Sequence, residues 1–250
     1  MTETELTLVE SAGRFPKVDL VEPNSFGYLL ATALVDRRPP LGYGFESRTK
    51  RRLLDAVHSA VAELKALPGV REVVRLKALL RPPGRSAFLR RRPAVHHARY
   101  DVAVWVETDD PDAATQLRTS PAWRQIETLL QQASTDVQVI TGHNARRMGD
   151  VDHTRNGVFL LNFFYADSAA VNLAVWEYTA GWFQDQTGLR NSTLLRPDSA
   201  TDYTVINHCR WDRLRDILPS LIFKPSFRRY VLAHFEANNT GAMPMLYHLA

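Results

Sequence analysis

The chain repeats a series of short patterns in the same order, which points to an internal duplication. In each copy, a glycine placed to end a helix is followed by Leu-Leu-Arg-Pro, a strand tyrosine and a proline that begins a helix. The matched positions are Gly69 and Gly188, 79–82 and 194–197, Tyr100 and Tyr203, and Pro121 and Pro225. One longer loop in the first copy, 83–97, accounts for the differences in spacing. A repeat of roughly 100 residues has the size of a small domain, whereas solenoid units run to roughly 20–50 residues.

The periodicity of each copy predicts the order β-α-β-β-α-β, which is that of a ferredoxin-like fold. The first copy has strands at 26–35, 70–80, 99–107 and 136–141 and helices at 47–67 and 111–132. The second has strands at 158–165, 191–195, 203–211 and 243–249 and helices at 169–187, 212–218 and 225–237. We therefore expect an α+β protein with an irregular arm (1–25), a first repeat (26–141), a linker (142–156) and a second repeat (157–250).

Bulk composition excludes several classes of protein. Hydrophobic residues make up 45% of the 250 residues and charged residues 23%, which is typical of a globular protein with a buried core. No apolar run reaches the roughly 18–20 residues of a membrane helix, and the polar beginning does not resemble a secretory signal. A single cysteine, Cys209, rules out an internal disulfide and a cysteine metal cluster. A net charge of +4 is mild. We expect a cytoplasmic protein that binds neither nucleic acid nor membrane.

Motifs for cofactors and metals are missing from the sequence. It contains no glycine-rich dinucleotide loop, no His-x-x-x-His and no Gly-x-Ser-x-Gly. His96 and His97 are adjacent, so on a strand they would face opposite sides rather than share a metal ion. We therefore expect no metal and no cofactor. The basic loop 83–97 carries three consecutive arginines, and a loop of this length suits a lid or a dimer contact.

The second copy resembles the antibiotic-biosynthesis monooxygenase group of the dimeric α+β barrel superfamily. The resemblance covers 157–250 and, more loosely, 26–141. It rests on an aromatic helix ending in Thr-Gly (187–188), the Leu-Leu-Arg strand (194–196) and Asn-His-Cys-Arg-Trp (207–211), with Lys-Pro-Ser-Phe (224–227) beyond. In that family two ferredoxin-like subunits pair their sheets into one barrel, so a tandem chain would build the barrel within one polypeptide. A homodimer of such chains stays open.

The resemblance implies a cofactor-independent oxygenase that oxidises an aromatic polyketide, such as an anthrone, with O2. In that chemistry the deprotonated substrate passes an electron to O2, while the protein binds the ring, stabilises the anion and excludes water. Two alternatives stay open. One is a haem-binding or haem-degrading protein, although the helix position that would carry the ligand histidine is near Tyr230 or Val231. The other is a cyclase or a binding module on the same scaffold.

Comparison of the two copies indicates where the chemistry would lie. Alternate residues of a strand share a face. On the strand of the first copy that face carries Val102, Val104 and Val106, whereas the matching face of the second carries Val205, Asn207, Cys209 and Trp211. Burying an amide where the sister copy has valine costs about 1–3 kcal/mol unless the amide is hydrogen-bonded. Asn207 and Trp211 are also the residue types with which the resembled family holds its aromatic substrate.

Further candidates come from the surrounding elements. Asn162 lies in the apolar run 158–165 and shares its face with Val158, Leu160 and Phe164, so we expect it in the pocket. We expect catalysis to involve Asn207, Trp211 and His234, with His234 or a water taking the proton. The expected substrate-binding residues are Asn162, Trp176, Tyr178, Trp182, Arg228 and His248. Each has a structural alternative: Asn207 as a tie at a strand end, the aromatic residues as ordinary core, the histidines as hydrogen-bonded structural groups and Arg228 on a solvated helix face.

Overall fold

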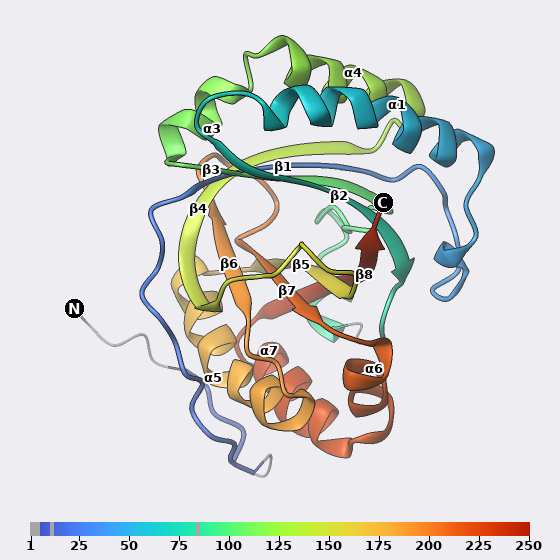
Figure 1. Ribbon diagram of the computed structural model, residues 1–250. Helices are drawn as coiled ribbons and strands as arrows, with labels where there is room; N and C mark the ends of the chain where they lie inside the picture. Colours follow the sequence, from blue (N-terminus) through green and yellow to red (C-terminus); the bar gives the residue numbers. More distant parts are fainter. Residues whose placement is uncertain (1–5, 11–12, 84–85) are drawn as a thin grey trace.

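The computed structural model describes residues 6–10, 13–83 and 86–250, and the eight strands found there close into one antiparallel barrel (Figure 1). The strands of the first half are β1 (Gly27–Ala33), β2 (Val70–Leu80), β3 (Val102–Thr108) and β4 (Val137–Gly149). Those of the second are β5 (Val158–Ala166), β6 (Ser192–Pro197), β7 (Val205–Trp211) and β8 (Thr240–Leu249). Around the barrel they run β1-β3-β2-β8-β5-β7-β6-β4.

Both halves arrange their strands in the same way. The order is β4-β1-β3-β2 in the first half and β8-β5-β7-β6 in the second. Antiparallel pairing of β2 with β8 and of β4 with β6 joins the two sheets. The expectation that the sheets of the two halves meet within one chain is therefore confirmed. None of the helices in the described part of the chain combines the length and the apolar character needed to cross a bilayer.

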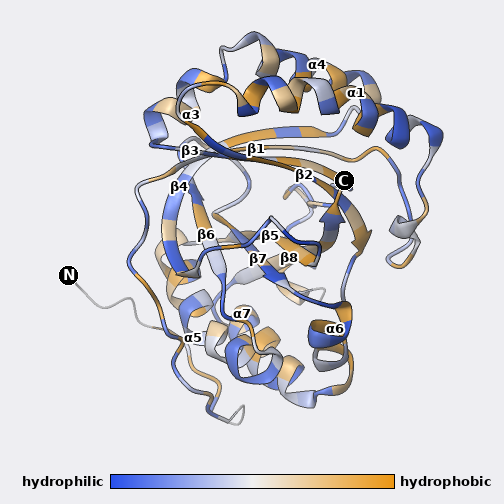
Figure 2. Ribbon diagram, in the orientation of Figure 1, coloured by the Kyte–Doolittle hydropathy of each residue, from blue (hydrophilic) through white to orange (hydrophobic). Residues whose placement is uncertain are grey.

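Helices cover the barrel on two opposite sides (Figure 1). The first half contributes α1 (Arg48–Lys65), α3 (Pro111–Leu117) and α4 (Pro121–Ala133), and the second contributes α5 (Ala169–Thr187), α6 (Leu214–Phe223), the π-helix η3 (Phe227–Leu232) and α7 (Ala233–Ala237). The starts of α1 and α5 have serine caps: Ser47 accepts from the Lys50 amide and Ser168 from the Val171 amide. Gly188 ends α5 with φ of 67°, a left-handed conformation that favours glycine. On α1 and α4 the hydrophobic residues lie toward the sheet (Figure 2).

Side-chain alternation along the strands produces three apolar layers. The barrel interior includes Trp105, Phe163 and Tyr247. The outer face of the first sheet packs under α1 and α4, and that of the second sheet packs under α5, α6, η3 and α7. Val102, Val104 and Val106 are fully buried in the layer of the first half, as their spacing predicts.

The structure differs from the sequence-based expectation at several boundaries. The strand expected to end at Thr141 continues to Gly149, because 142–149 pairs with β6 of the other half. The expected linker 142–156 therefore begins with a strand. β8 starts at Thr240 rather than at 243, and the loop 83–97 contains a short helix, α2 (Ala87–Arg90).

The arm 6–25, apart from residues 11–12, runs along the molecule to the helices of the second half (Figure 1). Val18 is buried there, and Phe15 packs edge-on against Tyr230 with ring centroids 4.7 Å apart. The arm comes so close to α5 that a Cβ atom added to Gly181 would lie 1.9 Å from the carbonyl oxygen of Pro16. Glycine at 181 is therefore a condition for this contact.

Candidate functional site

Two adjoining cavities lie between the sheet of the second half and its helices. The first, about 30 Å³, reaches from β6 and β7 to α5. The second, about 40 Å³, lies toward α6, η3 and β8. Their common walls are Leu160, Asn162, Phe183, Trp211 and Phe235. Because Leu160, Asn162 and Trp211 project from the outer face of the sheet, strand alternation places both cavities in the helical layer rather than inside the barrel.

A pair of asparagines supplies amide groups to this apolar site. Asn162 of β5 and Asn207 of β7 are directly opposite each other in the antiparallel ladder, and both line the first cavity. Oδ1 of Asn207 accepts from the Ser192 hydroxyl at 2.5 Å, and its Nδ2 lies 3.9 Å from Sγ of Cys209. Oδ1 of Asn162 is buried without a hydrogen-bond partner among the described residues. The pair thus presents one unused acceptor and one weakly engaged N–H donor side by side.

Trp211 lines both cavities, but its indole N–H is already in use. Nε1 donates to Oγ1 of Thr187 at 3.0 Å, at the end of α5. The ring thereby joins β7 to α5 and presents its apolar surface to the cavities. Trp211 therefore offers the cavities its ring and not a free N–H donor.

His234 does not lie where a catalytic base is needed. Its Nδ1 donates to the carbonyl oxygen of Tyr230 at 2.7 Å, and its Nε2 accepts from the backbone N–H of Val9 at 3.1 Å. The ring is 1% exposed and lines neither cavity. Since both nitrogens are used by the backbone, the assignment of His234 as the base is corrected: the side chain fastens the arm to η3 and α7.

The other expected residues divide between the site and its surroundings. Trp176 lines the first cavity. Trp182 is fully buried but lines neither cavity, and its N–H donates to Ser226 at 3.0 Å. Tyr178 faces an open groove between α5 and the arm, stacked on Tyr230. Nδ1 of His248 donates to the Gly157 carbonyl oxygen at 2.7 Å, and the side chain lines neither cavity.

Arg228 is exposed on η3 and also lines neither cavity. The structure therefore brings together Asn162, Trp176, Asn207 and Trp211, and it separates the remaining candidates from them. Tyr178 and Trp182, both expected to bind substrate, are four residues apart on α5, yet they do not face a common pocket. Their rings turn instead to the groove and to η3.

Sequence reasoning missed the residue that orients the amide pair. Ser192 of β6 is fully buried and lines the first cavity beside Asn207. Its strand neighbour Leu194 pairs with Asn207 in the ladder, so Ser192 lies on the same face two residues earlier. The pairing register between β6 and β7 is the signal that would have located it, and the sequence alone does not give that register.

No described residue lining the two cavities is ionised or poised to ionise near neutral pH. Cys209 is the one titratable group there, and complete burial raises the pKa of its thiol well above the ordinary value. The thiol therefore stays protonated and is neither a base nor a strong nucleophile. The polar groups facing the cavities are amides and hydroxyls, which hold and polarise a ligand by hydrogen bonds alone.

The present volumes limit what the cavities hold. The cavities, of about 30 and 40 Å³, can each admit a water molecule or a diatomic gas, since one water needs roughly 10–15 Å³ of cavity volume. The walls between them are side chains, among them the half-buried Phe183 of α5. A flat ring system therefore enters only when such side chains turn aside and the two spaces merge.

Comparisons with known proteins give fold-level likenesses. Neither a protein-family model nor a curated protein sequence matches the chain. Among solved structures, an anthrone oxidase-like protein matches with a TM-score of 0.61 and 8% identity over 92% of each chain. A protein of Fusobacterium nucleatum provisionally named a monooxygenase gives 0.54 and 8%, covering 90% of this chain and 91% of its own. A mutant chlorite dismutase of Candidatus Nitrospira defluvii gives 0.52 and 11%, covering 92% and 94%.

Identities of this size establish the fold alone. The chain shares a barrel with helices on two sides with these proteins over nearly its whole length. This agrees with the dimeric α+β barrel that the resemblance of the second copy implies. Two of the three neighbours carry names of oxidative enzymes, and the third is named a chlorite dismutase.

Proposed function

We propose that this protein oxidises an electron-rich, flat aromatic ketone of the anthrone type with O2 at the amide pair Asn162 and Asn207. The observation that carries the proposal is the position of two opposed amides on an otherwise apolar, buried sheet face, one with an unpartnered oxygen. A buried amide without partners costs about 1–3 kcal/mol. A ligand with a donor and an acceptor side by side would remove that cost, and the enol form of a phenolic ketone has both.

In this proposal the amides act on the substrate oxygens. Oδ1 of Asn162 accepts from a substrate hydroxyl, and Nδ2 of Asn207 donates to the oxygen on which negative charge develops. A donor aimed at a developing oxyanion in a water-poor site typically contributes about 2.7–4 kcal/mol to the lowering of the barrier. Ser192 holds the carbonyl end of Asn207, so that the N–H end is directed toward the cavity.

The reaction balances without a further reductant. The substrate loses a proton from its CH2 carbon to water, and the resulting carbanion passes one electron to O2. The radical pair combines to a peroxide, whose O–O bond breaks as the second C–H proton leaves. One oxygen atom remains as the new carbonyl of a quinone, and the other departs as water. Because no described residue lining the site is a base, the acidity of the substrate itself controls the first step.

Haem binding, the first alternative, does not fit the residues that line the two cavities at the amide pair. A haem needs a pocket of several hundred Å³ and an axial ligand. No described histidine lines either cavity, His234 has both nitrogens bound, and burial keeps the thiol of Cys209 protonated. We derive no step through haem.

We also infer that the two halves are diverged ferredoxin-like copies, 26–141 and 157–250, of which the second carries the site. Two pairs of matched residues support the duplication because they touch each other across the barrel. The hydroxyls of Tyr100 and Tyr203 are 2.7 Å apart, and the rings of Trp105 and His208, each five positions further along its copy, lie 4.4 Å apart. Residues related by a two-fold axis meet in this way only when they lie beside the axis.

The test is oxygen uptake by the purified protein with anthrone. We expect one O2 consumed per anthrone, anthraquinone as the product, and no Soret band in the absorption spectrum of the active preparation. The rate of oxygen uptake should rise with pH as a larger fraction of the substrate ionises. A more acidic anthrone should therefore reach the same rate at a lower pH. The variant His234→Gln should keep the same profile. Uptake no faster than in buffer, or activity that follows a Soret band, would overturn the proposal.

A further inference from the structure

The basic loop of the first half is attached to the second half by acidic side chains. Glu236 of α7 accepts from the Ser86 hydroxyl at 3.0 Å, from the Phe88 backbone N–H at 2.8 Å and from the Arg91 guanidinium at 2.7 Å. Arg92 pairs with Asp167 at 3.0 Å. Two of the three consecutive arginines are thus neutralised by carboxylates of the second half.

The third arginine of that run has a different position. Arg90 lines a depression of about 380 Å³ together with Arg81, His97 and Arg99. None of the described residues lining this depression is acidic, and neither Arg90 nor Arg99 forms an ion pair with a described carboxylate. Arg99 is half-buried, which reduces the screening of its charge by solvent. The depression is therefore a partly enclosed space of positive potential.

This depression adjoins the candidate site. It shares Pro82, Ala242 and Pro244 with the second cavity, which in turn shares Asn162 with the first. β2 pairs only with Leu246–Leu249 of β8, so the first part of β8 has no strand partner on that side. A proline at 244 suits such an unpaired position since it has no N–H to leave unsatisfied. Pro244 is also opposite Asn162 in the ladder of β5 and β8.

We propose that this depression, the arginine mouth, binds a carboxylate on the substrate while the aromatic rings lie at the amide pair. The inference rests on the proposed function, because it takes the rings to occupy the merged cavities. Arg90 and Arg99 hold the carboxylate by charge-assisted hydrogen bonds, which are shorter and stronger than neutral ones. The substrate class is thus an acidic aromatic ketone rather than a neutral one, and a substrate entering by this mouth passes Pro82 and Pro244 on its way to Asn162.

Binding of a matched pair of unreactive ligands tests the inference. Anthraquinone-2-carboxylate and anthraquinone-2-carboxamide have the same rings and differ in the charge of one substituent. We expect the carboxylate to bind the wild-type protein at least about tenfold more tightly than the amide, by calorimetric titration at low salt. The variants Arg90→Gln and Arg99→Gln should each remove most of that preference and leave the affinity for the carboxamide unchanged.

A matched control removes a positive charge elsewhere. Arg124 is exposed on α4, across the barrel from the site, so Arg124→Gln should keep the full preference for the carboxylate. Equal losses in all three variants would mean a general effect of net charge and would overturn the arginine mouth. The ratio of the affinities for the carboxylate and the carboxamide should also decrease when the salt concentration is raised from about 50 to 500 mM, because screening weakens ion pairs.

The outcomes separate this inference from the function on which it rests. Oxidation of anthrone, together with equal affinities for carboxylate and amide, would overturn the arginine mouth and leave the proposed function standing. A carboxylate preference that is lost in Arg99→Gln, without any oxidation of anthrone or its carboxylate, would support the mouth and reject oxidation. If neither quinone binds and no oxygen is consumed, both proposals fail.

Discussion

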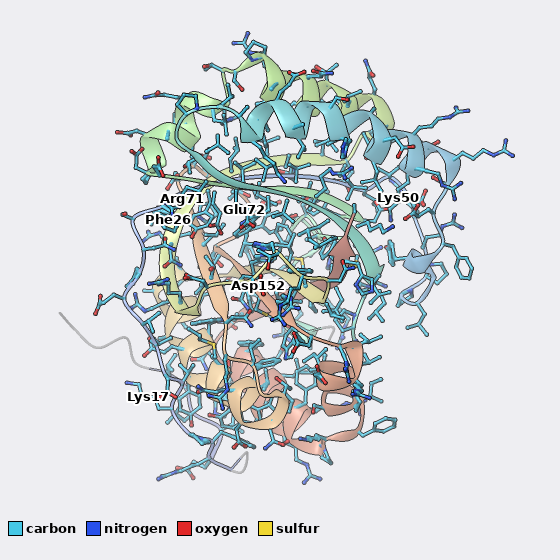
Figure 3. The ribbon with its side chains drawn as sticks, in the orientation of Figure 1. Lys17, Phe26, Lys50, Arg71, Glu72 and Asp152 are labelled. Carbon is cyan, nitrogen blue, oxygen red and sulfur yellow. The ribbon has the colours of Figure 1, made fainter. Side chains whose placement is uncertain are left out.

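Inside the barrel, His208 and His153 share a hydrogen bond in a place closed to solvent. Their Nε2 atoms are 2.8 Å apart, Nδ1 of His208 donates to the Leu160 carbonyl at 2.9 Å, and Nδ1 of His153 meets Glu72 at 2.7 Å. His208 is therefore neutral, with its Nε2 accepting from Nε2 of His153, and the far side of His153 meets the carboxylate of Glu72, which is labelled in Figure 3. Burial first, and then His153, lower the pKa of His208 well below its ordinary value.

This histidine predicts a pH dependence of stability. In the unfolded chain His208 binds a proton below about pH 6.5, whereas in the folded protein it does not. The unfolded state therefore gains protons as the pH falls, and the free energy of unfolding decreases below about pH 6.5. In His208→Gln, whose amide can still donate to Leu160, this contribution is absent. As the pH falls from 7.5 to 5, the free energy of unfolding of the variant should increase by up to about 2 kcal/mol relative to that of wild type, as measured by urea unfolding.

The titration of Glu107 does not affect the comparison of wild type with His208→Gln. Burial raises the pKa of the Glu107 carboxyl, which has the opposite effect on the pH dependence, but Glu107 is present in both proteins. The difference between the two unfolding curves thus reports His208 together with the hydrogen bond it shares with His153. Parallel curves from pH 7.5 to 5 would show that His208 is protonated in the folded protein as readily as in the unfolded one.

At the same scale, strand alternation was sufficient to find part of the site. Asn207 and Trp211 follow from the comparison with the valine face of 102–106, and Asn162 follows from its polar side chain in an apolar run. The structure places all three at the cavities. His234 and Trp182 could not be judged in this way, because their partners come from the arm and from η3. The use of a donor by a distant backbone atom or hydroxyl leaves no local pattern in the sequence.

Among the elements, α5 depends on Gly181 where the arm crosses it. The variant Gly181→Ala has two opposing effects. Helix propensity favours alanine by about 1 kcal/mol, whereas a Cβ atom 1.9 Å from the Pro16 oxygen must displace the arm. We expect the displacement to prevail, with a lower melting temperature and faster proteolytic cleavage within 13–25.

The matched control for Gly181 is Gly44→Ala, where an added Cβ meets nothing within 4 Å. That variant should keep the arm as resistant to protease as in wild type. A Gly181→Ala protein that is more stable than wild type and equally resistant would show that the arm does not depend on this close approach.

The boundaries of elements were predictable to the extent that local signals set them. Serine caps and the glycine at 188 define α5, and the prediction of 169–187 agrees with Ala169–Thr187. The predicted strand ends at 141, whereas β4 continues to Gly149. The continuation includes Arg146 and Arg147 and is stabilised by pairing with β6. Pairing between halves is a property of the closed barrel, and the composition of 142–149 does not reveal it.

For the whole molecule, the closed barrel makes each half dependent on the other. The interior layer draws on both sheets, and β2–β8 and β4–β6 pairing closes the wall. We predict that fragments 1–156 and 157–250, expressed together, purify as a one-to-one complex. Fragment 157–250 alone should aggregate or self-associate, because Phe159, Leu161 and Phe163 would be exposed to water. Two stable, monomeric fragments that do not bind each other would contradict this account.

The asymmetry between the halves is the central claim, and one measurement tests it most directly. Asn207 and Val104 occupy matched positions, so Asn207→Ala and Val104→Ala should be compared for anthrone oxidation per folded molecule, alongside their melting temperatures. We predict that Asn207→Ala loses about 10²–10³ in rate while staying folded. Val104→Ala should be less stable by about 1–3 kcal/mol, because a buried valine is truncated, yet keep its rate per folded molecule. Full turnover in a destabilised Asn207→Ala protein would contradict the account, since the amide would then only tie a strand.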